Sequence, residues 1–65
     1  MYMLINEPQS GELKEAFKVL DDVFGTNEFT EARAVNSIQV GLEVETGHAQ
    51  QIFNTLKRND NLGEV

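Results

Sequence analysis

The apolar positions of residues 10–25 repeat at helical spacing and predict the first helix. Six apolar residues follow one another at steps of three or one, which places them on one side of a helix with about 3.6 residues per turn. They are Leu13, Ala16, Phe17, Leu20, Val23 and Phe24. Ser10 is placed as the N-cap, and Gly25 is placed to end the helix in a left-handed conformation.

A second helix is predicted over residues 30–41. Its apolar side consists of Ala34, Val35 and Ile38. Thr30 is placed as the N-cap, with Phe29 before it as a hydrophobic staple. Gly41 is the expected end of this helix.

A third helix is predicted over residues 46–59. Thr46 is placed as its N-cap, and an irregular turn separates it from the second helix. Leu42 and Val44 of that turn are expected to point inward. The apolar stripe of the third helix consists of Ala49, Ile52, Phe53 and Leu56, at the spacing of one helix face.

The two ends of the chain are expected to be extended. Residues 1–6 contain a short apolar run that stops before Pro8, which favours a short strand or an arm. Residues 61–65 follow a turn-forming sequence and are a short strand or a tail. The two runs have the option of pairing with each other, or of leaving an edge that recruits a second chain. The expected fold class is therefore mainly α, a single small domain of three helices with short terminal β segments.

Length and composition narrow the class of protein further. Sixty-five residues make one domain with a small core, so homodimerisation is an option for stability. The chain has no Cys, so neither a disulfide nor a thiolate metal site supplements the core. No apolar run approaches the roughly 20 residues that span a bilayer. A cytoplasmic protein without a membrane partner is expected.

Charge is distributed unevenly along the chain. The formal net charge is −6, yet residues 46–59 contain no acidic residue and carry Lys57, Arg58 and the only His. Arg33 stands among acids on the second helix, where a surface ion pair is the expected interaction. The negative net charge of the protein repels nucleic acid at long range. The acid-free third helix departs from that charge and is the first place to look for a binding surface.

The polar side of the third helix has the composition of a nucleic-acid-binding surface. Amides of Gln and Asn pair with adenine, and the guanidinium of Arg pairs with guanine. Lysine, histidine and a helix N-terminus bind phosphate groups. The candidate DNA-binding residues are His48, Gln50, Gln51, Asn54, Thr55, Lys57 and Arg58. An ordinary solvated face, or a face that contacts protein, explains the same composition.

Residues Phe29–Val65 resemble a helix-turn-helix domain, including its winged-helix variety. The resemblance consists of a capped second helix, a turn with a buried aliphatic residue at Val44, and a third helix that buries Ala49, Phe53 and Leu56. It implies DNA binding and transcription regulation, with the third helix in the major groove. Too few residues follow Asp60 for a wing hairpin, so the wing is absent, truncated or completed by Met1–Ile5.

The alternative function is that of an acidic adaptor or inhibitor that binds a protein, with imitation of DNA by its acidic surface as one option. Its contact surface is either the third helix or the acidic side of the first helix, formed by Glu12, Glu15 and Asp22.

No enzyme, cofactor or metal site is expected. One His without Cys offers little for catalysis. Glu45 and His48 have a Glu-x-x-His spacing, but further ligands are missing. Glu12–Asp21 is similar to the entering helix of an EF-hand, yet Val23, Gly25 and Ala32 stand where calcium needs oxygen ligands.

Overall fold

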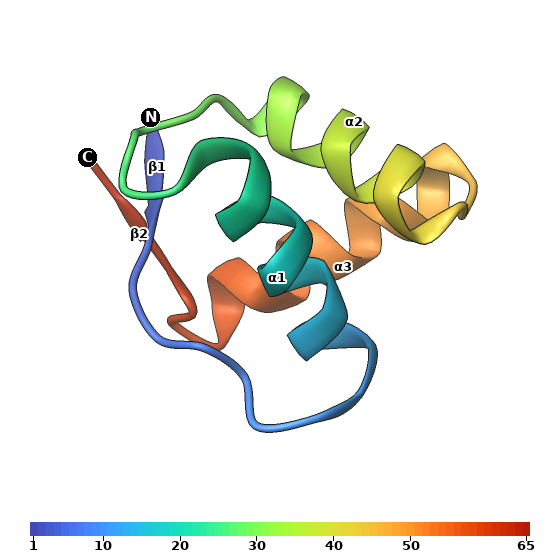
Figure 1. Cartoon of the computed structure of the whole chain (residues 1–65), viewed down its shortest axis with the longest axis horizontal. Coiled ribbons are helices and arrows are strands. Elements are labelled where there is room, and N and C mark those ends of the chain that lie inside the picture. The colour runs from blue at the N-terminus through green and yellow to red at the C-terminus, as the bar shows by residue number, and fades with distance from the viewer.

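The computed structural model describes residues 1–65 and consists of three helices with a short strand at each end of the chain (Figure 1). The elements are β1 (Tyr2–Leu4), α1 (Gly11–Phe24), α2 (Glu31–Leu42), α3 (Thr46–Arg58) and β2 (Leu62–Glu64). The mainly helical fold class expected from the sequence is confirmed, as are its short terminal strands. None of the helices has the length and apolarity needed to cross a membrane.

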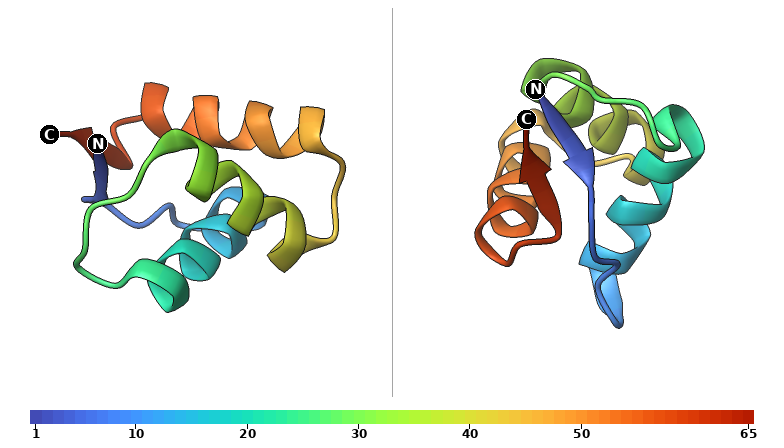
Figure 2. Two further views of the ribbon diagram at one scale, coloured as in Figure 1. Left: turned by 90° about the horizontal axis from the view of Figure 1, so that it is seen from above. Right: turned by 90° about the vertical axis from the view of Figure 1, so that its left-hand side faces the viewer.

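The terminal strands pair with each other in antiparallel orientation at one end of the molecule (Figures 1 and 2). Met3 is opposite Gly63, and Leu4 is opposite Leu62. On its other side, β1 exchanges two backbone hydrogen bonds with Phe29, each of 2.8 Å between N and O of Tyr2 and Phe29. The N-terminal strand therefore lies between β2 and the segment that precedes α2.

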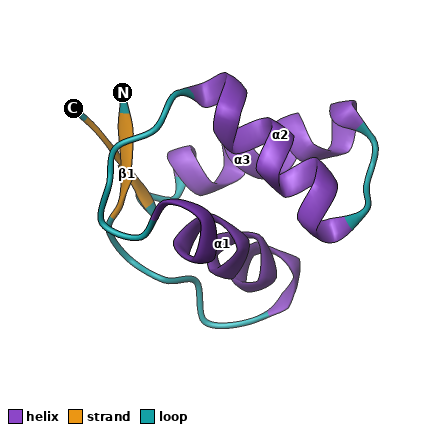
Figure 3. Cartoon of the chain, turned by 45° about the horizontal axis from the view of Figure 1, so that its top comes forward, coloured by secondary structure: helices purple, strands orange, loops and turns teal.

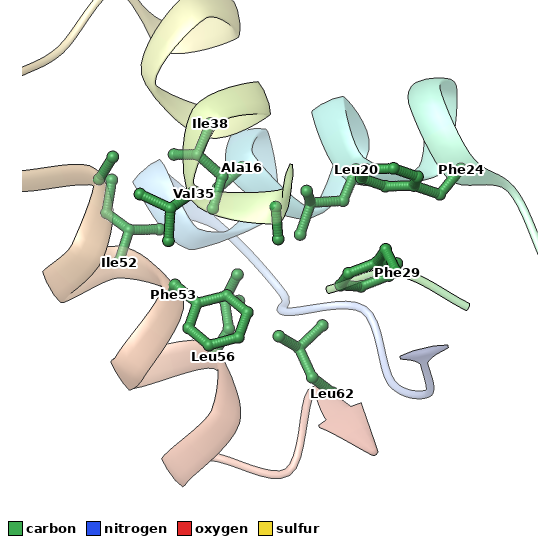
Figure 4. Packing of buried hydrophobic residues seen from close by; sticks show 12 residues of the cluster. Ala16, Leu20, Phe24, Phe29, Val35, Ile38, Ile52, Phe53, Leu56 and Leu62 are labelled. Atoms are coloured by element: carbon green, nitrogen blue, oxygen red, sulfur yellow. The ribbon is translucent and has the colours of Figure 1, made fainter. Parts of the chain in front are cut away.

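The core lies where the three helices and the strand pair meet (Figure 4). Its largest fully buried side chains are Phe29, Phe53, Leu20, Ile38 and Leu56. The ring of Tyr2 meets Phe53 edge-on at 5.2 Å between centroids, and Phe24 stacks on Phe29 at 4.6 Å. Aromatic pairs of this kind add about 0.5–1.5 kcal/mol to the burial of their area. The strand pair thus closes one end of the helical core.

The helix ends agree with the sequence in part. Thr30 caps α2 as predicted, because its Oγ1 accepts a hydrogen bond of 3.2 Å from the backbone N–H of Arg33. Gly25 ends α1 with a φ of 58°. Ser10 holds the N-cap position of α1, but its side chain makes no capping bond. The prediction of Thr46 as N-cap is wrong, since Glu45 holds that position and the Thr46 hydroxyl donates to Oε1 of Gln39 at 3.0 Å.

Two predictions on the packing of α1 against α2 are wrong. Gly41 does not end α2, which continues to Leu42 and is capped by Glu43 at a φ of 56°. A methyl group at position 41 would lie 2.7 Å from both γ-carbons of Val19, so the glycine serves the close approach of the two helices. Val19 therefore packs where Val23 was expected, and Val23 is 55% exposed. Leu42 and Val44 do pack against the core, as predicted.

We expect Gly41→Ala to lower the free energy of unfolding by about 1–3 kcal/mol, because the added methyl group has no room beside Val19. Adding Val19→Ala should recover part of that loss, since the two residues are in contact and their effects are coupled. Gly47→Ala is the matched control, because nothing lies within 4 Å of the corresponding position. Urea denaturation of the parent chain and the three variants measures these differences. Equal effects at positions 41 and 47 would contradict the proposed contact.

Candidate nucleic-acid interface

The exposed side of α3 is a straight row of residues opposite the core. Gly47, Gln51, Asn54 and Arg58 follow one another at steps of four, three and four, and all four are exposed. We call these four residues the outer ridge. The opposite side of α3 holds Ala49, Ile52, Phe53 and Leu56, which are all buried. Because the core fixes the rotation of the helix, the ridge points directly into solvent.

One flank of α3 is hydrogen-bonded to α2. Nε2 of Gln50 donates to Oε2 of Glu31 at 2.8 Å and to Oδ1 of Asn54 at 3.1 Å. Gln50 and Asn54 are thus brought together, as neighbours four residues apart on a helix allow. Glu31 was not among the site residues suggested by the sequence. Nineteen positions separate it from Gln50, and no local pattern relates the two.

The other flank of α3 is joined to α1. Nε2 of His48 lies 2.8 and 2.9 Å from the two carboxylate oxygens of Glu12. This is the ion pair of the structure when His48 is protonated, and both side chains are nearly half exposed. Exposed pairs of this kind contribute little to stability, about 0–1 kcal/mol. His48 thus belongs to the boundary between α1 and α3 and stands apart from the outer ridge.

The last turn of α3 gathers the remaining candidates. The Thr55 hydroxyl donates to the backbone carbonyl of Gln51 at 2.9 Å, and Nη2 of Arg58 lies 3.4 Å from that hydroxyl. Nζ of Lys57 lies 5.6 Å from the ring centroid of Tyr2 and 5.8 Å from that of Phe53. Lys57 is therefore directed toward β1, whereas Arg58 belongs to the ridge. Both cations are favourable at a helix C-terminus.

Arg33 lies outside this surface and does not form the ion pair predicted from the sequence. Its guanidinium carbon lies 5.7 Å from the ring centroid of Phe24, a cation–π contact. Phe24 is the last residue of α1, and its ring lies beside the first turn of α2, within reach of Arg33. The sequence showed the acids around Arg33 but gave no sign that the helix crossing brings this ring to it.

The exposed side of α3 offers polar groups to solvent. No pocket is found on the protein, and no three metal-ligating side chains come together. What the ridge offers is an amide pair and a guanidinium, all exposed and on one side of a helix. Such groups form hydrogen bonds to the edges of bases or to polar groups of another protein.

Comparison with known proteins adds no relative. No protein-family model matches the chain, and neither a curated protein nor a solved structure is found to be similar to it.

Proposed function

We propose that this chain is a small non-enzymatic regulator that binds duplex DNA by placing α3 in the major groove. The observation that carries the proposal is the outer ridge, an acid-free row of polar residues on a helix whose other side is buried. A major groove admits one α-helix, and amide and guanidinium groups are the side chains that distinguish base edges there. Gln51, Asn54 and Arg58 are the proposed base-contacting residues.

The arrangement around α3 supports a helix-turn-helix domain of the winged-helix variety. α2 and α3 are separated by only three residues, and Val44 of that turn packs against the core. In the winged-helix variety a strand pair follows the third helix. Here β2 follows α3 directly and its partner is β1 (Figure 3), so the N-terminal run takes the role of the second wing strand.

Phosphate contacts are expected at the two ends of α3. The N-terminal turn around Gly47 has free backbone N–H groups and open space above it, which suits an anionic oxygen. Lys57 at the other end lies beside β1, where a wing approaches the backbone of DNA. His48 and Thr55 flank these positions. Only two to four phosphates are within reach of so few cations, so the salt dependence of binding should be shallow.

Acidic residues beside α3 set an upper limit on affinity. Glu43 and Glu45 are exposed in the turn that leads into the helix, and the net charge of −6 repels DNA at long range. Glu12 and Glu31 are each engaged by a residue of α3, at His48 and Gln50. The proposed complex therefore depends on short-range contacts of the ridge more than on a basic field.

A protein-binding role remains the second candidate. It is favoured by the exposed acids of α1, among which Glu15 and Asp22 lie clear of any ion pair. Glu12, which the sequence placed on the same acidic side, is engaged by His48. An adaptor or inhibitor of this kind would use α1 and would leave the ridge of α3 free.

The double variant Asn54→Ala, Arg58→Glu should lose duplex binding by about 100-fold or more. It removes one base contact and replaces a second by a repelling charge, and each good contact accounts for about 1–3 kcal/mol. Fluorescence anisotropy with a mixed-sequence duplex at low salt measures the loss, and circular dichroism confirms that the variant is folded.

Lys18→Glu on the exposed side of α1 is the matched control, because it changes the net charge by the same amount as Arg58→Glu. It should alter affinity only severalfold, through the long-range field. DNA binding that survives the double variant would show that α3 is not the reading helix. A complex with a protein partner that survives it, together with absent DNA binding by the parent chain, would favour the adaptor.

A further inference from the structure

The side chains of Glu31, Gln50 and Asn54 form a chain of hydrogen bonds that runs from α2 across α3 to the outer ridge. The first bond joins Nε2 of Gln50 to the Glu31 carboxylate at 2.8 Å, and the second joins the same nitrogen to Oδ1 of Asn54 at 3.1 Å. Glu31 and Gln50 are both partly buried, whereas Asn54 is exposed. Only the last member of the chain is available to a partner.

The donor and acceptor roles in this series of hydrogen bonds are fixed at its buried end, by Glu31. An ionised carboxylate only accepts hydrogen bonds, so Gln50 must turn its NH₂ group toward Glu31. The second N–H of that NH₂ group then donates to Asn54, which must answer with its carbonyl oxygen. The NH₂ group of Asn54 is thereby left pointing outward. Glu31 thus determines, through two bonds, which half of the Asn54 amide faces solvent.

We infer that Glu31 is a positioning residue that makes the outer ridge select hydrogen-bond acceptors on base edges. This inference rests on the proposed DNA-binding function and names its preferred ligand. A free Asn amide pairs with adenine by donating to N7 and accepting from the N6 amino group. The bond from Gln50 turns Oδ1 of Asn54 toward the flank of α3, so the amide presents its NH₂ group to a base without the carbonyl beside it, and the guanidinium of Arg58 likewise only donates.

The expected target is therefore guanine, which presents N7 and O6 as two acceptors, or thymine through O4. Adenine is disfavoured at the position that Asn54 contacts, because the carbonyl oxygen that would accept from its N6 amino group is turned toward Gln50. The expected DNA site therefore has acceptor-rich bases at two nearby positions, one contacted by Asn54 and one by Arg58.

Selection from a random duplex library tests the inference. The position that Asn54 contacts is identified as the one whose preference disappears in Asn54→Ala. In the parent chain that position should be guanine or thymine, with adenine at least about fivefold weaker. In Glu31→Gln, residue 31 is able to donate as well as accept, so Asn54 is free to turn and adenine should become acceptable at that position.

Glu43→Gln is the matched control, because it removes one carboxylate next to α3 without touching the chain of hydrogen bonds. It should raise affinity for every duplex and leave the preference unchanged. A parent preference for adenine at the Asn54 position, or an unchanged preference in Glu31→Gln, would overturn the inference while leaving DNA binding intact.

Side-chain amide NMR signals separate these failures from a failure of the proposed function, since they require no DNA. The NH₂ signals of Gln50 should change in Glu31→Gln and stay constant in Glu43→Gln. Unchanged Gln50 signals would overturn the positioning role. A chain that shows the expected amide signals but binds no duplex would refute the DNA-binding function instead.

A second, independent feature is the outer face of the strand pair. Met1, Met3, Ile5 and Val65 are between 38% and 62% exposed, and the side chain of Ile5 lies against Gly63. Glu64 is the only charged side chain in residues 1–6 and 61–65. In a chain of net charge −6, a second copy therefore meets little repulsion at this face.

The free edge of the sheet belongs to β2. The other edge of β1 is partly covered, because Tyr2 is bonded to Phe29 there while β2 pairs on the opposite side. Val65 and Asn61 bond to Met1 and Ile5 across the strand pair, so antiparallel alternation directs the backbone groups of Leu62 and Glu64 outward. We propose that two copies of this chain pair through the free edge of β2 and form one four-stranded sheet.

The size of this surface predicts a weak dimer. The strand pair occupies one end of the long axis of the molecule (Figure 1), and the two shorter extents are 23 and 20 Å. A contact across such an end falls at the low end of specific interfaces, below about 1,200 Å² in total. An antiparallel pairing of β2 with β2 is closed and two-fold symmetric, so association stops at two chains.

Sedimentation equilibrium without DNA tests the dimer. The mass of the parent chain should rise with concentration from 7.3 kDa toward twice that value. Glu64→Pro removes an outward N–H without breaking the internal ladder, and Met3→Glu places a charge on the apolar face. Glu64→Pro should remain monomeric at concentrations where the parent chain associates, whereas Met3→Glu should still dimerise because the face of the sheet stays open.

Val40→Glu is the matched control for Met3→Glu, because Val40 is an apolar residue of α2 with 68% exposure. It should dimerise as the parent does. A parent chain that stays at monomer mass up to millimolar concentration would overturn the proposal. So would dimers that persist in Glu64→Pro, or dimers lost in Met3→Glu or Val40→Glu.

Discussion

The position of β1 between two other segments is the constraint on which the rest of the fold depends. Tyr2 exchanges backbone hydrogen bonds with Phe29 on one side, while its neighbours pair with β2 on the other. Its ring packs edge-on against Phe53 of α3. One residue thus connects the N-terminal run to the start of α2, to α3 and to the C-terminal strand. In a chain of 65 residues with a small core, these ties replace the disulfides or metals that other small domains use.

The packing of α3 determines which of its side chains face solvent. Its apolar stripe is held by the core, and its two flanks are held by Glu31 through Gln50 and by Glu12 through His48. The remaining side is the outer ridge. Two of the acidic residues beside α3 are thereby engaged along its flanks, and the ridge itself stays free of carboxylates. A protein of net charge −6 thus keeps one helix face without acidic side chains.

Much of the fold follows from local patterns in the sequence. Apolar spacing gives each helix, and the Thr30 cap follows from the preference of a hydroxyl for the free N–H groups of a helix start. The contact of Val19 with α2, while Val23 is exposed, is not local. It depends on Gly41 of another helix, beside which the side chain of Val19 lies. Periodicity within α1 places Val23 on the apolar stripe and leaves Val19 off it, because the pattern of one helix does not show where a neighbouring helix crosses.

The candidate site divides in the same way. The polar composition of α3 is visible in the sequence, and so is the row at steps of four, three and four. The partners of Gln50 and His48 lie 19 and 36 positions away. Such contacts depend on tertiary packing, so Glu31 and Glu12 carry no local signal. The direction in which the Asn54 amide points becomes visible only once Glu31 is placed beside Gln50.

The central claim is that the outer ridge contacts DNA, and a backbone amide NMR titration with a mixed-sequence duplex at low salt tests it most directly. The account predicts shifts that cluster on residues 46–59, with the largest at Gln51, Asn54 and Arg58, and that reverse when salt is added. Absence of shifts at millimolar duplex, or shifts confined to α1, would contradict it.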